Sequence, residues 1–287
     1  MANEITTTSA DDLSYAAQIL AADILENFYG NNIAAPLVRK ADIGGFPSRA
    51  KDFPISPALA AASLAEGVDM ANTAFSTTKV TITAAEVGLL LTITDLLSVS
   101  DIVGDEYYAG EAGKALASKF TTDVLALASG FSQQCGATTV DLTETNIIDG
   151  LVLLQAGGVS PPYVAALHPR QWGDLVGSMG SYINQVGSGS GARAESNDVM
   201  VSPDGGLGRL YGVSWYISHL VPTATAGADR LGMIVAPQYA LGHVEKWAAR
   251  VEFERDASLR AREIALTACY GLGELRDAAG IGVLTDA

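Results

Sequence analysis

Apolar residues recur at helical spacing near the N-terminus and again in the middle of the chain. A helix is predicted over residues 9–29, followed by Gly30 as a stop signal, and one of its faces carries Leu13, Leu20, Ile24 and Phe28. A longer helix is predicted from about residue 100 to about residue 131, and shorter ones over 144–156, with Thr143 as its cap, and over 169–179. The apolar face of the first helix needs a partner, which is either its own domain or a neighbouring subunit.

Strands are predicted where apolar and polar residues alternate or where a short apolar run is bounded by turn residues. The predicted strands cover residues 78–84, 163–167, 212–218, 231–235, 251–254 and 264–270. Between residues 36 and 74 prolines and glycines interrupt any regular pattern. An extended hairpin, with residues 37–51 leading out and 75–94 leading back, accounts for this stretch. Because such a hairpin cannot bury much of itself, we expect it to contact another subunit.

The composition is that of a folded, strongly acidic protein. Of the 287 residues, 48% are hydrophobic and 17% are charged, which supports a substantial core. The chain has 17 Lys and Arg against 32 Asp and Glu, a formal net charge of −15, so sequence-specific binding to nucleic acid is not expected. The longest uncharged run, residues 150–169, is interrupted by one pair of adjacent glycines and one pair of adjacent prolines, so no membrane span and no membrane partner are predicted. Without a basic start and apolar stretch at the N-terminus, we expect a cytoplasmic protein.

Residues with catalytic or metal-binding chemistry are sparse and scattered. Cys135 and Cys269 lack metal-type spacing and are expected to be buried, reduced thiols. The three histidines, His168, His219 and His243, stand apart from one another and are expected to be structural. The Gly/Ser loop at 187–191 resembles a phosphate loop only loosely. We therefore predict no catalytic residues, no metal and no cofactor.

Two clusters of charge stand out along the chain. The basic cluster consists of Arg39, Lys40, Arg49 and Lys51. The acidic cluster, at the start of the predicted long helix, consists of Asp101, Asp105, Glu106 and Glu111. The acids suit a solvated helix N-terminus, and they are also the nearest opposite charge to the basic cluster. We predict that the two clusters meet between subunits, in contacts that weaken with salt.

The order of these parts resembles the major capsid proteins of tailed bacteriophages, the Hong Kong 97-type shell fold, over nearly the whole chain. The stretches that carry the resemblance are residues 76–83, 167–172, 212–217 and 262–271. The resemblance implies an α+β protein with a long spine helix and an extended β-hairpin loop. It assigns residues 1–38 to an N-terminal arm, 39–95 to the extended loop, 96–139 and 246–287 to a peripheral domain, and 140–245 to an axial domain.

The resemblance also implies what the protein does and what it works with. Proteins of that family are structural and not enzymes: pentamers and hexamers of the chain form an icosahedral shell around double-stranded DNA. The implied location is the virion capsid, assembled in the bacterial host cytoplasm. The implied partners are further copies of the chain, a separate scaffolding protein, a portal and decoration proteins. An encapsulin-like nanocompartment shell and a soluble cytoplasmic α+β enzyme are the alternatives.

Overall fold

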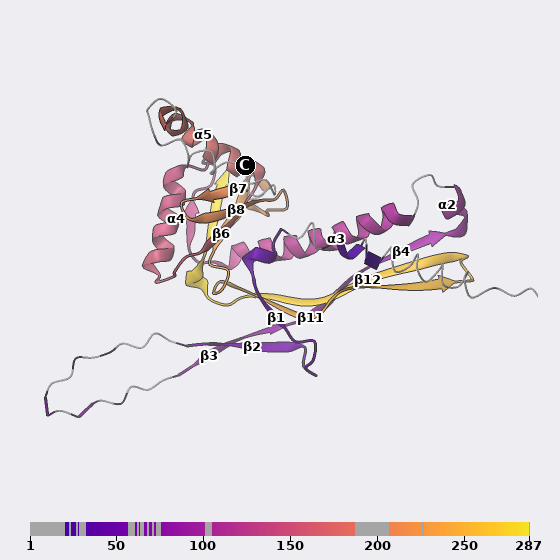
Figure 1. Ribbon diagram of the computed structural model, residues 1–287. Helices are drawn as coiled ribbons and strands as arrows, with labels where there is room; N and C mark the ends of the chain where they lie inside the picture. The colour runs from indigo at the N-terminus through magenta and orange to yellow at the C-terminus, as the bar shows by residue number, and fades with distance from the viewer. Residues whose placement is uncertain are drawn as a thin grey trace, which may run out of the picture.

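The computed structural model describes residues 33–56, 76–100, 105–186, 207–224 and 227–286, with residues 21, 22, 24–26 and 28 and isolated positions between 61 and 72. Four helices have described bounds, α2 (Asp95–Ser100), α3 (Asp105–Ala126), α4 (Glu144–Ala156) and α5 (Pro169–Val186), and residues 21, 22, 24–26 and 28 are also helical. They are arranged around two sheets and a separate hairpin (Figure 1). Short 3₁₀ helices cover Ala35–Leu37, Leu127–Gly130 and Asp277–Ala279.

The larger sheet has seven strands and forms one half of the molecule. Its order is β5-β13-β10-β6-β8-β7, with β9 paired to β10. The strands are β5 (Gln134–Gly136), β6 (Tyr163–Leu167), β7 (Leu207–Leu210), β8 (Val213–Ile217), β9 (Thr223–Ala224), β10 (Asp229–Val235) and β13 (Gly280–Asp286). All five residues of β6 are buried, as expected for an apolar strand with neighbours on both sides. Helices α4 and α5 lie beside this sheet (Figure 1).

The smaller sheet is long and narrow. Its order is β1-β11-β12-β4, and its strands are β1 (Arg39–Asp42), β4 (Ala85–Thr94), β11 (Leu241–Asp256) and β12 (Ala261–Glu274). Helix α3 runs along this sheet (Figure 1). Phe120 of α3 contacts the rings of His243 and Tyr270 edge to face, with centroids 4.9 and 5.2 Å away. This face of the sheet, which we call the inner face, therefore belongs to the main core, together with Ile264 and Leu266.

A two-stranded hairpin projects from the opposite, outer face of the smaller sheet (Figure 1). It is formed by β2 (Ala50–Ile55) and β3 (Thr78–Thr83), which among the described strands pair only with each other. A separate small core fixes its base and consists of Ile43, Phe53, Ile82, Val244 and Leu275. Glycines of β12 permit this packing, since a Cβ on Gly273 would lie 3.0 Å from Ile82 and one on Gly271 would collide with the carbonyl of Thr83.

Most elements predicted from the pattern are present. The short helix 144–156 and the strand 163–167 have the predicted bounds, and the long helix starts at Asp105 and continues as 3₁₀ turns to Gly130. Thr143 is the N-cap residue of α4, as predicted, although its side chain makes no capping hydrogen bond. Two details were wrong: the third helix extends past residue 179 to Val186, and the outgoing strand of the hairpin is only Ala50–Ile55. The adjacent strands β1 and β4 pair instead with β11 and β12 of the smaller sheet.

The sheets also cross the domain boundaries expected from the sequence. Residues 96–139 and 246–287 were assigned together, yet their strands β5 and β13 lie in the seven-stranded sheet with β6, β8 and β10. Strands β1 and β4, assigned to the extended loop, lie in the four-stranded sheet. The division of the chain into these domains stays an expectation. In both sheets, strands from different expected domains are hydrogen-bonded to each other.

Candidate assembly surfaces

The basic cluster lies at the base of the hairpin. Arg39 and Lys40 are exposed on β1, and the Lys40 Nζ lies 2.8 Å from a carboxylate oxygen of Glu245 in the same chain. Arg49 is exposed and Lys51 is half-buried, where β2 begins. Within the described part of the chain, Arg39, Arg49 and Lys51 form no ion pair. Three of the four basic side chains are therefore available to another molecule.

The acidic cluster is not brought against the basic cluster within one chain. Asp101 lies outside the described residues. Asp105 and Glu106 begin α3, and nothing of their side chains is described. Glu111 forms an ion pair with Lys114 on the same helix, at 2.9 Å. The expected meeting of the two clusters between subunits stays a prediction.

Polar contacts hold the hairpin together beyond its small core. Asp52 on β2 accepts hydrogen bonds from Lys79 at 2.6 Å and from Thr81 at 2.5 Å, both on β3. The hydrogen bond from Lys79, and then that from Thr81, lowers the pKa of the Asp52 carboxyl below its usual value. At the base, Lys246 donates to the main-chain carbonyl groups of residues 43, 46 and 48 and so fixes the turn that leads into β2.

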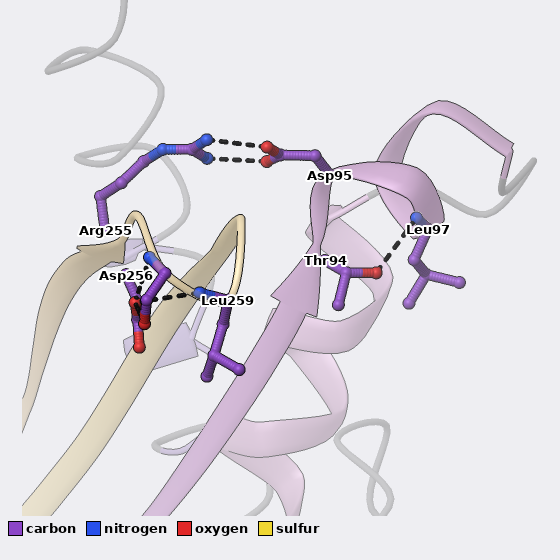
Figure 2. A network of polar contacts seen from close by, with 7 residues as sticks. Thr94, Asp95, Leu97, Arg255, Asp256 and Leu259 are labelled. Atoms are coloured by element: carbon purple, nitrogen blue, oxygen red, sulfur yellow. Dashed lines mark hydrogen bonds and ion pairs between the residues drawn. The ribbon is translucent and has the colours of Figure 1, made fainter.

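The end of the smaller sheet farthest from the seven-stranded sheet is fastened by a second polar network, which we call the distal tip (Figure 2). The two guanidinium Nη atoms of Arg255 each donate to one carboxylate oxygen of Asp95, both at 2.7 Å. This pairing lowers the pKa of Asp95, mainly through the hydrogen bond. Asp256 accepts hydrogen bonds from the amides of Ser258 and Leu259 in the β11–β12 turn. The start of α2 is thereby bound to the end of β11.

Apolar side chains are exposed around the distal tip. Leu96 is 80% exposed and Leu259 is 58% exposed, next to Asp95 and in the β11–β12 turn respectively. The sequence pattern did not identify this surface, because Asp95 and Arg255 are 160 residues apart. The only local signal was the pair of leucines that directly follows an acidic residue at the end of a β-branched strand.

The apolar stripe of the N-terminal helix is only partly within the described residues. Leu13 and Leu20 lie outside them. Ile24 is fully buried and Phe28 is 8% exposed, and both belong to the main core of their own chain. These two side chains therefore offer little surface to a neighbouring subunit, and a direct role in assembly stays a prediction for Leu13 and Leu20.

Cys135, Cys269 and His243, whose side chains could support catalysis or metal binding, are buried in the fold. Both cysteines are free and buried, as the sequence predicted, and burial raises the pKa of Cys135 to about 12. Burial also lowers the pKa of His243 to about 4, with Glu245 acting in the opposite direction. Across the described ranges, no three His, Cys, Asp or Glu side chains are grouped as metal ligands. No described helix combines the length and apolar character needed to cross a membrane.

The chain is similar in structure to capsid proteins of several phages. It matches the capsid structure of cyanophage P-SCSP1u with a TM-score of 0.63 and 18% identity, covering 87% of this chain and 86% of the other. It matches a Mycobacterium phage Che8 structure with a TM-score of 0.67 and 17% identity, covering 88% and 90% of the two chains. A virus-like particle from Pyrococcus furiosus matches with a TM-score of 0.60 and 11% identity, covering 93% and 98%.

Comparisons of sequence do not add to this likeness. No protein-family model matches the chain, and no curated protein matches it. The structural matches extend over about nine tenths of the chain. This α+β chain has the Hong Kong 97-type fold of tailed-phage capsid proteins.

Proposed function

We propose that this protein is the major structural subunit of an icosahedral capsid that encloses double-stranded DNA. The observation that carries the proposal is the hairpin of β2 and β3, which projects from the molecule and pairs with no other strand in the described part of the chain. A two-stranded hairpin is marginally stable alone in water and is normally stabilised by further packing. The likeness to phage capsid structures over most of the chain supports copies of the same protein as that packing partner.

The proposed assembly consists of pentamers and hexamers, with the hairpin and the N-terminal arm contacting neighbouring copies. The net charge of −15 suits a container for DNA, because an acidic wall does not hold phosphate groups during filling. A separate scaffolding protein and a portal are the further partners in this proposal, and decoration proteins are optional ones. Assembly in the host cytoplasm and a location in the virion capsid follow from the same proposal, and no catalytic activity is part of it.

A nanocompartment shell is the second candidate function. The match to the Pyrococcus furiosus virus-like particle, which spans 98% of that chain, supports it. Both candidates are closed containers, and they differ in what they enclose: a nanocompartment holds a cargo protein, and a capsid holds DNA. The contents of the particle therefore separate the two.

Sedimentation velocity and negative-stain electron microscopy of the purified protein test the proposal. Closed shells, or rings of five or six copies, are the expected result. A compact monomer or dimer at all concentrations would contradict the container function and favour a soluble enzyme. Shells purified from infected cells are expected to contain nuclease-protected double-stranded DNA, whereas a stoichiometric second protein inside them would favour the nanocompartment.

A further inference from the structure

Only half of the outer face of the four-stranded sheet is covered within one chain. The half near Gly271 and Gly273 lies under β3 and the small core at the hairpin base. The other half runs from Thr267 to the distal tip and faces outward. Its central apolar residue, Leu90, is 57% exposed, although it lies opposite Ala265 of the neighbouring strand. We call this half the open outer face.

The open outer face carries an unfavourable arrangement of charge. Glu254 of β11 is directly opposite Glu263 of β12, and like charges in that position destabilise a sheet. Glu252 lies on the same face, two residues along β11, and its carboxylate is 3.5 Å from Arg250. Neither Glu254 nor Glu263 has an ion pair among the described residues. This part of the surface would be stabilised by a cationic partner.

Complementary charge is present at the hairpin base of the same chain, but it cannot reach. Arg49 is close to Cys269: burial, and then the charge of Glu86, raises the pKa of that thiol, and Arg49 acts in the opposite direction. The main-chain carbonyl of Arg49 accepts a hydrogen bond from the Ala84 amide at 2.8 Å. Glu263 is six residues from Cys269 along β12, which corresponds to about 20 Å at roughly 3.3 Å per residue. An arginine side chain does not span that distance. Arg49 and Lys51 can therefore meet Glu254 and Glu263 only between two copies.

We propose that the open outer face binds the hairpin base of a second copy of this chain, with Arg49 and Lys51 of one copy facing Glu254 and Glu263 of the other. This inference rests on the proposed self-assembly and names one of its contacts. The contact relieves the repulsion between the two glutamates and covers Leu90. It assigns the basic cluster an acidic partner different from the start of α3.

Charge exchange tests this contact. Reversal of the basic side, Arg49→Glu with Lys51→Glu, and reversal of the acidic side, Glu254→Lys with Glu263→Lys, are each expected to abolish assembly in sedimentation velocity. An exposed ion pair changes an association constant by at most about fivefold, so the loss arises from two reversed pairs repeated around a ring. The protein that carries all four changes is expected to assemble again. Asp141→Lys with Asp149→Lys changes the net charge by the same amount as the reversal of Glu254 and Glu263, and this control is expected to assemble.

The competing partner gives a different pattern. If Asp101→Lys with Glu106→Lys restores assembly to the protein with the reversed basic side, and the change at Glu254 and Glu263 does not, the start of α3 is the partner and the inference is wrong. Unchanged assembly after reversal of Glu254 and Glu263 also overturns it. Melting temperatures of the unassembled variants show that each one folds.

Chemical crosslinking provides a readout that does not depend on complete shells. Two populations, one with Arg49→Cys and one with Glu254→Cys, are mixed and treated with a short bismaleimide linker. The natural cysteines are both buried and do not compete. A covalent dimer that appears only in the mixture supports the contact, and no dimer in a mixture that assembles refutes it. If wild-type protein never assembles, the proposed function fails, and this contact fails with it.

Discussion

Replacement of Ile24 by alanine shows whether the N-terminal helix stabilises its own subunit. Ile24 is fully buried in the main core. The substitution removes three carbon groups, each contributing about 0.8 kcal/mol when buried, and leaves a cavity that adds to the loss. We therefore expect the free energy of unfolding to fall by about 2–5 kcal/mol, the range found for such changes in cores. Urea denaturation of the unassembled protein, followed by circular dichroism, measures it.

Ile33, which is near Ile24 in the sequence, provides a matched control. It is the same residue type and is 36% exposed, so Ile33→Ala removes less buried surface and is expected to cost less than half as much. An equal effect of the two substitutions, or a loss below about 0.5 kcal/mol for Ile24→Ala, would refute the packing of this helix on its own subunit. A variant that unfolds normally but does not assemble would show instead that Ile24 acts between subunits.

Three further predictions concern single buried side chains, and each is tested by substitution or by chemical labelling. Gln171 is fully buried, accepts a hydrogen bond from the His168 amide, and donates to Thr285 at 2.7 Å and to two strand carbonyl groups. Gln171→Leu is therefore expected to lower the free energy of unfolding, measured by denaturation, by about 1–3 kcal/mol or more. Gln171→Glu is expected to lower it further. His243 has a folded pKa of about 4 against an ordinary 6.5, so the unfolded chain binds a proton that the folded chain does not. Stability should therefore fall by up to about 3 kcal/mol between pH 6.5 and 4, and His243→Phe should flatten this slope, which pH-dependent unfolding would detect. Cys135, with its pKa raised to about 12, should resist a thiol reagent at pH 8 in the native protein and react once urea unfolds it; rapid native labelling would contradict its burial.

Local pattern was sufficient for many of the individual elements. The bounds of α4 and β6 follow from the spacing of apolar residues alone, and the spine helix was predicted at its core positions Leu116, Phe120 and Val124. These features depend on interactions within a few residues, or on the single requirement that an apolar face be buried. The buried, reduced state of both cysteines follows from composition and spacing in the same way.

The partners of those elements were decided only by the tertiary structure. The basic cluster was visible in the sequence, but the rung of Glu254 opposite Glu263 depends on the register of β11 against β12, and two irregularities near Trp247 shift that register. A shift by one residue moves every side chain to the other face of a sheet, and no local pattern specifies it across a bulge. The ion pair between Asp95 and Arg255 joins residues 160 positions apart, so no local pattern specifies it either. The sequence thus determined which segments become helices and strands, and the packing of distant segments determined which charges and apolar groups share a surface.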